Sequence, residues 1–320
     1  MARSSLPDTV LPDASPRGGA SGRSVAASLL VSLRPGQWTK NLILFAGLIF
    51  GRQLFAPHEL GRAWAAFAVF CALSGVVYLI NDVIDRESDR RHPLKARRPI
   101  ASGDLSPRLA VAVAAGMTVV SLAAAFWLGT LFGLVSMAYV GLLACYSFWL
   151  KHVVIMDVLT IAIGFVLRAA AGAVVVAVPI SQWLLVCTVL LALFLALSKR
   201  RHEIVLLADG AVEHRRILGE YSPYLLDQMI GVVTASTLIA YIFYTINPET
   251  VQKFGTELLG VTIPFPLYGI FRYLYLVHRR EGGGSPAEML LTDRPLLVCV
   301  ALWAALVVLI IYRPFGAPGV

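Results

Sequence analysis

The sequence is poor in charged residues. Only 14% of its 320 residues are Asp, Glu, Lys or Arg, whereas 58% are hydrophobic, and the mean hydropathy is +0.75. Soluble globular domains are typically about a quarter charged. The composition therefore excludes a water-soluble domain and indicates a chain whose solvent is lipid.

Cysteine motifs and a signal peptide are also lacking. The four cysteines lie inside apolar runs without the CxxC or Cys/His spacing of a disulfide framework or zinc site, so we interpret them as small core residues. The first 23 residues contain no continuous apolar stretch and are rich in Ser, Pro, Gly, Ala and Arg. We expect residues 1–33 to form a disordered cytoplasmic tail, followed by one membrane domain over residues 34–320.

Long apolar runs make up most of the remaining chain. About 20 apolar residues cross the hydrocarbon core of a bilayer. We predict an all-α integral membrane protein, a bundle of about nine transmembrane helices. The first run is short and contains two glycines, so eight spans are an alternative. The predicted spans are 41–56, 61–80, 108–128, 130–149, 153–176, 181–198, 226–246, 258–277 and 295–312.

Basic residues outnumber acidic ones, 27 to 19. A basic surplus can indicate a nucleic-acid partner, but here most of the Lys and Arg residues fall in the tail and in alternate loops between apolar runs. This distribution follows the positive-inside rule. We therefore predict no nucleic-acid partner and a multi-pass protein of the inner (plasma) membrane, whose N-terminus lies in the cytoplasm.

An acidic motif follows the second predicted span, on the side predicted to be cytoplasmic. If the helix continues, Asp82, Asp85 and Asp89 fall at i, i+3 and i+7 on one face. Like charges at this spacing repel unless a cation lies among them, and Mg²⁺ prefers such oxygen ligands. We predict that the three aspartates are catalytic and bind Mg²⁺. For a lone aspartate, a solvated helix end would be the simpler interpretation.

A cluster of cations follows the motif and ends at Arg98, directly before Pro99. Carboxylates beside cations on a short loop suit a metal-bound diphosphate, because the metal takes some oxygens and Arg binds others. The positive-inside rule alone explains most of these charges. Only Arg98 is therefore predicted separately to bind substrate.

Two charged residues lie within the fifth predicted span. Asp157 and Arg168 are eleven residues apart, about three helical turns, and charges in lipid are costly unless they face a cavity. We expect both to line a polar chamber; ion pairs with other helices are the alternative. Lys151 precedes this span, where it either reaches a lipid phosphate or only sets topology.

These features together resemble the UbiA superfamily of intramembrane prenyltransferases. The NDxxDxxxD pattern at Asn81–Asp89 and the RPxxxG pattern at Arg98–Gly103 match this superfamily, and the likeness extends over residues 34–313. It includes an early Lys40–Asn41 pair. The resemblance implies a UbiA-like bundle that uses Mg²⁺, and it adds Lys40, Asn41 and Asn81 to the expected substrate-binding residues.

The sequence departs from most of this family after the sixth span. Where a second Asp-rich motif is usual, residues 198–203 read SKRRHE, with one carboxylate and four potential cations. Such a loop suits free phosphate groups. We predict that Lys199, Arg200 and Glu203 bind substrate, as does Tyr146. The chain thus resembles the branch that transfers phosphoribose from phosphoribosyl diphosphate to a decaprenyl-like polyprenyl phosphate in cell wall biosynthesis.

Two other functions stay open at this stage. One is a prenyltransferase that moves a polyprenyl group from its diphosphate to an aromatic quinone precursor; a second Asp-rich motif would distinguish it. The other is a transporter or scaffold that coordinates a cation. The acidic motif lies at the membrane interface and we find no internal repeat, both of which disfavour a transporter. Lipid chain length and a homo-oligomeric state are left open.

Overall fold

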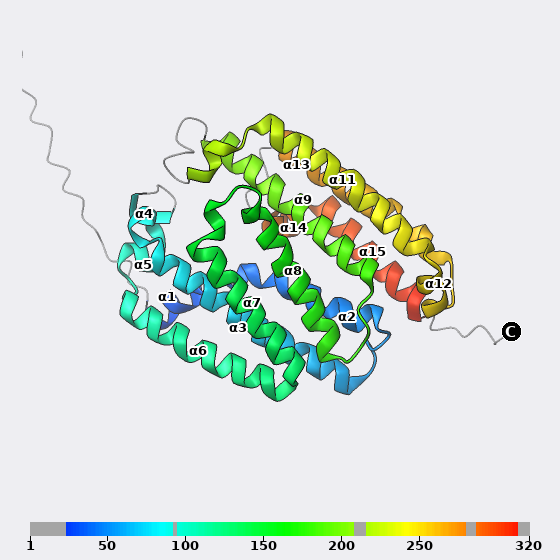
Figure 1. The fold of residues 1–320 in the computed structure, drawn as a ribbon, viewed down its shortest axis with the longest axis horizontal. Coiled ribbons are helices and arrows are strands. Elements are labelled where there is room, and N and C mark those ends of the chain that lie inside the picture. The colour runs from blue at the N-terminus through cyan, green and yellow to red at the C-terminus, as the bar shows by residue number, and fades with distance from the viewer. Residues whose placement is uncertain (1–23, 92–94, 208–215, 280–285, 313–320) are drawn as a thin grey trace, which may run out of the picture.

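The computed structural model describes residues 24–91, 95–207, 216–279 and 286–312, and every element in these ranges is helical (Figure 1). The first elements are α1 (Val25–Ser32), η1 (Pro35–Leu44), α2 (Phe45–Phe50), α3 (Pro57–Ile84), α4 (Arg86–Arg91), η2 (Lys95–Arg97), α5 (Pro99–Ser102), α6 (Pro107–Leu128), α7 (Thr130–Phe148) and η3 (Leu150–His152). The others are α8 (Met156–Val175), α9 (Gln182–Leu207), η5 (Arg216–Glu220), α11 (Pro223–Ile246), α12 (Pro248–Phe254), η6 (Leu258–Thr262), α13 (Pro264–Arg279), α14 (Pro286–Thr292) and α15 (Arg294–Tyr312). The predicted all-α fold is confirmed.

Seven helices are long and apolar enough to cross a membrane, namely α3, α6, α7, α8, α9, α11 and α15. A further pair, α12 and Leu258–Arg279, passes the same test but is bent by 101°, so the described residues hold up to eight spans. Helices α6 and α7 agree closely with the predicted runs 108–128 and 130–149. Helix α9 continues well past residue 198, because the charged residues that follow are partly buried inside the bundle.

The first predicted span, 41–56, is not one continuous α-helix. It consists of the last part of the 3₁₀ helix η1, then the short helix α2. Glycines on both sides allow close packing. A Cβ added at Gly47 would lie 2.6 Å from the backbone nitrogen of Ala173, and one added at Gly172 on α8 would collide with the carbonyl of Leu44. Segment 41–56 therefore packs backbone to backbone against α8.

Part of the predicted tail is ordered. Helix α1 lies within residues 1–33, begins at a cap where the Ser24 side chain accepts a hydrogen bond from the Ala27 N–H, and contacts α3 and α5. Its Ser28 and Ser32 are buried, which shows that this helix belongs to the bundle. The expectation of disorder is wrong for α1, and residues 1–23 lie outside the described residues.

Helix α8 occupies the centre of the bundle. It contacts α7, α9, α3, α2 and η1, and α6 lies against α3 and α7 (Figure 1). Aromatic rings of Phe70, Phe132 and Tyr139 fill the core between α3 and α7. The short helices α4 and α5 lie at one end of the molecule and α12 at the other. We call the end that carries α4 and α5 the motif end.

Candidate active site

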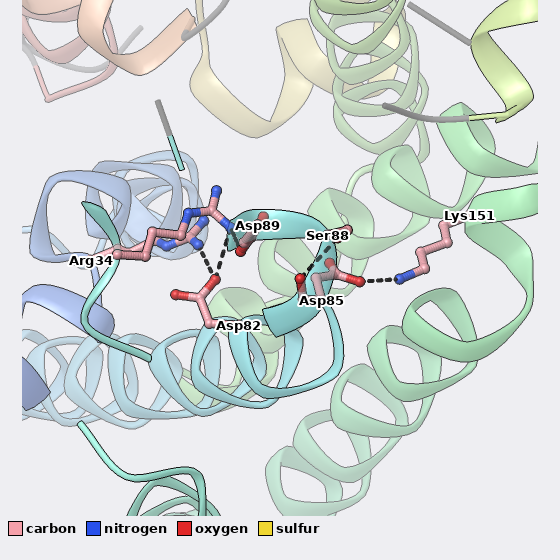
Figure 2. A network of polar contacts seen from close by, with 7 residues as sticks. Arg34, Asp82, Asp85, Ser88, Asp89 and Lys151 are labelled. Carbon is pink, nitrogen blue, oxygen red and sulfur yellow. Dashed lines mark hydrogen bonds and ion pairs between the residues drawn. The ribbon is translucent and has the colours of Figure 1, made fainter. Parts of the chain in front are cut away.

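The acidic motif lies where α3 stops. Asp85 caps the last turn of α3, and α4 begins at Arg86, so the three aspartates do not share one continuous helix face. Asp82 and Asp89 are buried and face one another, whereas Asp85 faces away toward Lys151, at 3.1 Å (Figure 2). The predicted single row of carboxylates is therefore wrong in its geometry, and Asp85 is separated from the other two.

Arginines hold the two buried aspartates together. One guanidinium nitrogen of Arg98 lies 3.1 Å from Asp82 Oδ1 and 2.6 Å from Asp89 Oδ2. Arg34 donates a further hydrogen bond to Asp82 (Figure 2). The Arg34 guanidinium also lies 4.8 Å from the centre of the Tyr78 ring. Arg98, which is predicted to bind substrate, thus contacts two aspartates of the motif directly.

Arg34 was not predicted as a site residue. In the sequence it is one of several basic residues in an N-terminal segment, which gave no reason to single it out. The structure places its backbone in the left-handed region, at φ 53°, immediately before Pro35. This turn between α1 and η1 directs its side chain to Asp82.

The donor atoms at the motif suit Mg²⁺. Within the described ranges no three His, Cys, Asp or Glu side chains converge as a preformed metal site. However, Asn81 Oδ1 is buried without a hydrogen-bond partner beside Asp82. Mg²⁺ typically takes one or two carboxylates and completes its shell with water and substrate phosphate oxygens. Asn81, Asp82 and Asp89 therefore fit such an ion when a diphosphate is also bound.

A second cluster surrounds Arg200 on α9. This side chain is 2% exposed, and each of its nitrogens has a partner. Nε donates to Asp157 at 2.7 Å, Nη1 to Glu203 at 2.5 Å and Nη2 to the Tyr146 hydroxyl at 3.3 Å. Lys199 Nζ lies 3.8 Å from Glu203. Tyr146 and Asp157, predicted from two other segments, thus meet Lys199 and Glu203 around Arg200.

Asp157 has a partner that the sequence did not reveal. The Tyr221 hydroxyl donates to Asp157 Oδ1 at 2.8 Å and accepts a hydrogen bond from the Ile155 N–H at 2.7 Å. Burial raises the pKa of Tyr221 to about 12, so the phenol keeps the proton that it donates. Asp157 therefore has the ion-pair role that was the alternative in the sequence analysis, and it pairs with Arg200, not with Arg168.

Arg168 lies deeper in the bundle among neutral partners. It donates to Asn41 Oδ1 at 2.8 Å, to the Tyr139 hydroxyl at 2.5 Å and to the Gly164 carbonyl at 3.2 Å. Ser74 hydrogen-bonds to Asn41 in turn. In the part of the chain that the structure describes, no carboxylate lies within ion-pair distance of Arg168. Arg168 and Asn41, which were predicted separately as site residues, are therefore brought together.

Lys40 is close enough to cations of both clusters for their charges to act on it. Burial, together with the charges of Arg168 and Arg34, lowers its pKa to about 8. It is also near enough to Lys199 for the two charges to repel. Across the described residues, Lys40 forms no ion pair. Cations from η1, α8 and α9 therefore lie near one another.

A cavity of about 180 Å³ lies away from these charged clusters. Its walls come from α2, α8, α9, α11 and α12, and they include Gly51, Val178 and Phe254. Helix α12 lies at the end opposite the motif (Figure 1). None of the predicted site residues lines this cavity, so we assign it no part of the site.

Buried acidic and basic clusters thus lie inside a multi-pass helical membrane bundle. Residues 41–292 match the UbiA prenyltransferase family. The chain belongs to this family.

Two named relatives and one solved structure are similar to this chain over most of its length. Decaprenyl-phosphate phosphoribosyltransferase of Mycolicibacterium smegmatis is 30% identical, over 91% of this chain and 94% of the relative. The protein of the same name from Corynebacterium glutamicum is 31% identical, over 91% and 88%. Among solved structures, a UbiA homolog from Archaeoglobus fulgidus bound to GPP and Mg²⁺ superposes with a TM-score of 0.68 at 21% identity, covering 89% of this chain and 99% of that one. This structural likeness supports the fold.

Proposed function

We propose that the protein transfers 5-phosphoribose from phosphoribosyl diphosphate to a polyprenyl phosphate and releases diphosphate. The observation that carries this proposal is the chemistry at the end of α9. There, the one carboxylate, Glu203, is already hydrogen-bonded to Arg200 and lies beside Lys199. This arrangement favours phosphate binding by cations over a second metal site. The names of the relatives at about 30% identity agree with it.

The acidic motif would bind the diphosphate of the donor. Asn81, Asp82 and Asp89 would hold Mg²⁺, which neutralises charge on the departing diphosphate. Arg98 keeps Asp82 and Asp89 together, because its guanidinium bonds to both. Asp85 belongs to the motif but contacts Lys151, so its contribution would be indirect.

The reaction would take place at the anomeric carbon of the ribose. An oxygen of the lipid phosphate forms a bond to this carbon as the bond to the diphosphate oxygen breaks, through an oxocarbenium-like transition state. No strong general base is needed, because the second pKa of a phosphate monoester is about 6 and the nucleophile is already anionic. The enzyme's contribution is then positioning and neutralisation of charge.

Within the α9 cluster, Lys199 and Arg200 have different roles. All three nitrogens of Arg200 are hydrogen-bonded to protein, so we assign Arg200 to holding Glu203 and Tyr146 in place. The Lys199 side chain is 41% exposed, and we assign it to the terminal phosphate of the donor. Lys151, which pairs with Asp85, would lie at the mouth of the site.

The reaction needs a lipid substrate from the membrane and a water-soluble donor. The excess of Lys and Arg in alternate loops supports a motif end that faces the cytoplasm of a plasma membrane. A homo-oligomer is compatible with this arrangement and is not required by it.

The test is a comparison of donors. Purified protein with Mg²⁺ receives labelled phosphoribosyl diphosphate and polyprenyl phosphate, and a parallel sample receives labelled prenyl diphosphate and an aromatic acceptor. We expect a labelled polyprenyl-phosphoryl phosphoribose in the first sample, formed only when both substrates are present. Label transfer to the aromatic acceptor, with phosphoribosyl diphosphate left intact, would establish the prenyltransferase alternative.

A further inference from the structure

Eight of the charged side chains toward the motif end form two groups in which the charges balance. In each group, two cations lie against two carboxylates. The first group consists of Arg34, Arg98, Asp82 and Asp89, and the second consists of Lys199, Arg200, Asp157 and Glu203. Lys40 and Arg168 belong to neither group. Among the described residues, these two cations have no carboxylate partner.

Arg168 carries its charge in a buried and otherwise neutral environment. The residue is 7% exposed, and its hydrogen-bond partners are an amide, a phenol and a backbone carbonyl. Its guanidinium also lies about 5 Å from the rings of Tyr139 and Phe165. Burying a charge without a counter-ion costs several kcal/mol, and hydrogen bonds to neutral groups offset only part of it. Such a charge fits a site whose counter-ion is a ligand.

Lys40 is a second cation close to this site. It precedes Asn41, whose amide oxygen accepts the hydrogen bond from Arg168. The charges of Arg168 and Arg34 both disfavour a protonated Lys40, and Lys199 adds to this repulsion. An anion placed between Lys40 and Arg168 would relieve the repulsion.

We infer that Lys40 and Arg168 form a binding site for a phosphate monoester, separate from the acidic motif, and that its ligand is the phosphate of the lipid acceptor. A phosphate monoester carries a charge of about −1.5 to −2 at neutral pH, which matches the two unpaired cations. The identification of the ligand as the lipid phosphate rests on the proposed function, whereas the inference that this site binds an anion does not.

The position of the site favours the lipid over the sugar phosphate of the donor. Ser74, which bonds to Asn41, precedes Asp82 by two turns on α3, or about 12 Å along the helix. The site therefore lies farther into the apolar bundle than the acidic motif. A water-soluble donor enters at the motif end, whereas a polyprenyl chain occupies the apolar part of the bundle.

The experiment measures binding to the full-length protein in detergent. Its probes are a short-chain polyprenyl monophosphate, the polyprenyl alcohol of the same length, and ribose 5-phosphate. We expect the wild type to bind the monophosphate at least about tenfold more tightly than the alcohol, since hydrogen bonds to charged groups contribute roughly 1.5–3 kcal/mol. Lys40→Met should remove most of this preference. Lys40→Arg should retain it.

The matched control is Lys253→Met on α12, where the lysine is exposed at the end opposite the motif. It should bind all three probes as the wild type does. Equal affinity of the wild type for monophosphate and alcohol would overturn the proposal. So would a Lys40→Met protein that keeps its melting temperature and loses only ribose 5-phosphate binding, because the site would then belong to the donor.

Enzyme kinetics separate this inference from the proposed function. Lys40→Met should raise KM for the polyprenyl phosphate about tenfold or more and leave KM for phosphoribosyl diphosphate unchanged. If the wild type transfers no phosphoribose yet binds the monophosphate through Lys40, the proposed function fails and the anion site stands. If transfer occurs and Lys40→Met leaves both KM values unchanged, the anion site fails and the function stands.

Discussion

One guanidinium joins the two buried aspartates of the acidic motif. Asp82 and Asp89 come from different helices, and Arg98 bonds to both, while Arg34 adds a second cation at Asp82. Two carboxylates this close repel one another, and the arginines offset that repulsion. The motif is therefore arranged before substrate binds, which reduces the reorganisation that binding a metal-diphosphate would require.

Substitution of single aspartates tests this arrangement. Asp82→Asn should lower kcat/KM at least about 100-fold, because charge stabilisation by a metal ion is worth several kcal/mol. Asp85→Asn should lower it about tenfold or less, because Asp85 and Lys151 form a partly exposed pair away from Arg98. Initial rates of phosphoribosyl transfer by the purified variants measure both effects.

Two outcomes would contradict the assignment. A fully active Asp82→Asn enzyme, or wild-type activity undiminished by a chelator, would show that no metal acts through this motif. Equal large losses in both variants would instead return Asp85 to the metal-binding set. Circular dichroism and melting curves serve as controls for folding.

The elements around α8 are held by very close packing and by one buried hydrogen-bond network. Gly172 allows the carbonyl of Leu44 to approach the α8 backbone, and Tyr221 ties the start of α8 to the segment before α11. Both contacts act between elements that are far apart in the sequence. The first contact fixes η1 relative to α8. Asp157, which accepts hydrogen bonds from both Tyr221 and Arg200, links α8 to α9 as well. These three elements carry Lys40, Lys199 and Arg168.

Gly172→Ala should destabilise the bundle, because the added Cβ collides with the Leu44 backbone, which cannot move as a side-chain end would. Overpacking of this kind costs about 1–3 kcal/mol. Gly141→Ala on α7 is the matched control, since a Cβ there meets no atom within 4 Å. Melting temperatures in detergent should fall for Gly172→Ala and stay level or rise for Gly141→Ala. A melting temperature unchanged by Gly172→Ala would argue against this close contact.

Tyr221→Phe should weaken the segment that starts α8. Removing the hydroxyl leaves the Ile155 N–H and one oxygen of Asp157 without this partner, a loss of about 1–3 kcal/mol. Tyr224→Phe, on an exposed neighbour, is the control. The melting temperature should fall only for Tyr221→Phe. If Tyr221→Phe keeps the wild-type melting temperature and donor KM, Tyr221 does not position Asp157.

Sequence patterns predicted the helices accurately where hydrophobicity alone determines the start and end of a span. The runs 108–128 and 130–149 became α6 and α7 because lipid requires continuous apolar helices there. The break in segment 41–56 and the end of α3 at Ile84 depend on packing against α8 and on pairing with arginines. A spacing of i, i+3 and i+7 does not contain that information, which is why Asp85 was misplaced.

Some residues of the candidate site could be singled out from the sequence, and others could not. Motif residues such as Arg98 were found because charges in a short pattern are conspicuous in an apolar chain. Arg34 and Tyr221 were not found, because the first depends on a left-handed backbone turn and the second contacts Asp157 from 64 residues away. Neither feature leaves a local signal in the sequence.

For the molecule as a whole, the positions of charge and of apolar surface determine how it sits in a membrane. Large apolar side chains on α6 face outward, among them Trp127, which is 87% exposed, as expected where lipid is the solvent. The buried charges gather at the motif end. Such a molecule presents one charged end to water and needs a fixed orientation, because its proposed donor is made on one side of the membrane.

Orientation can be measured with single cysteines at the two ends. Ser88→Cys on α4 and Gln252→Cys on α12 are both at exposed positions. Each is placed in a background where the native cysteines are alanine. The positive-inside rule predicts that a membrane-impermeant maleimide labels Ser88→Cys only in inside-out vesicles and Gln252→Cys only in right-side-out vesicles.

The paired design makes the result decisive. Labelling of both cysteines in both vesicle preparations indicates leaky vesicles, which a permeabilised sample identifies before the comparison is made. The reverse pattern would place the acidic motif outside the cell, away from a cytoplasmic supply of phosphoribosyl diphosphate. In that case Lys40, Arg168 and the motif would face a different pool of anions, and the proposed donor would have to be abandoned.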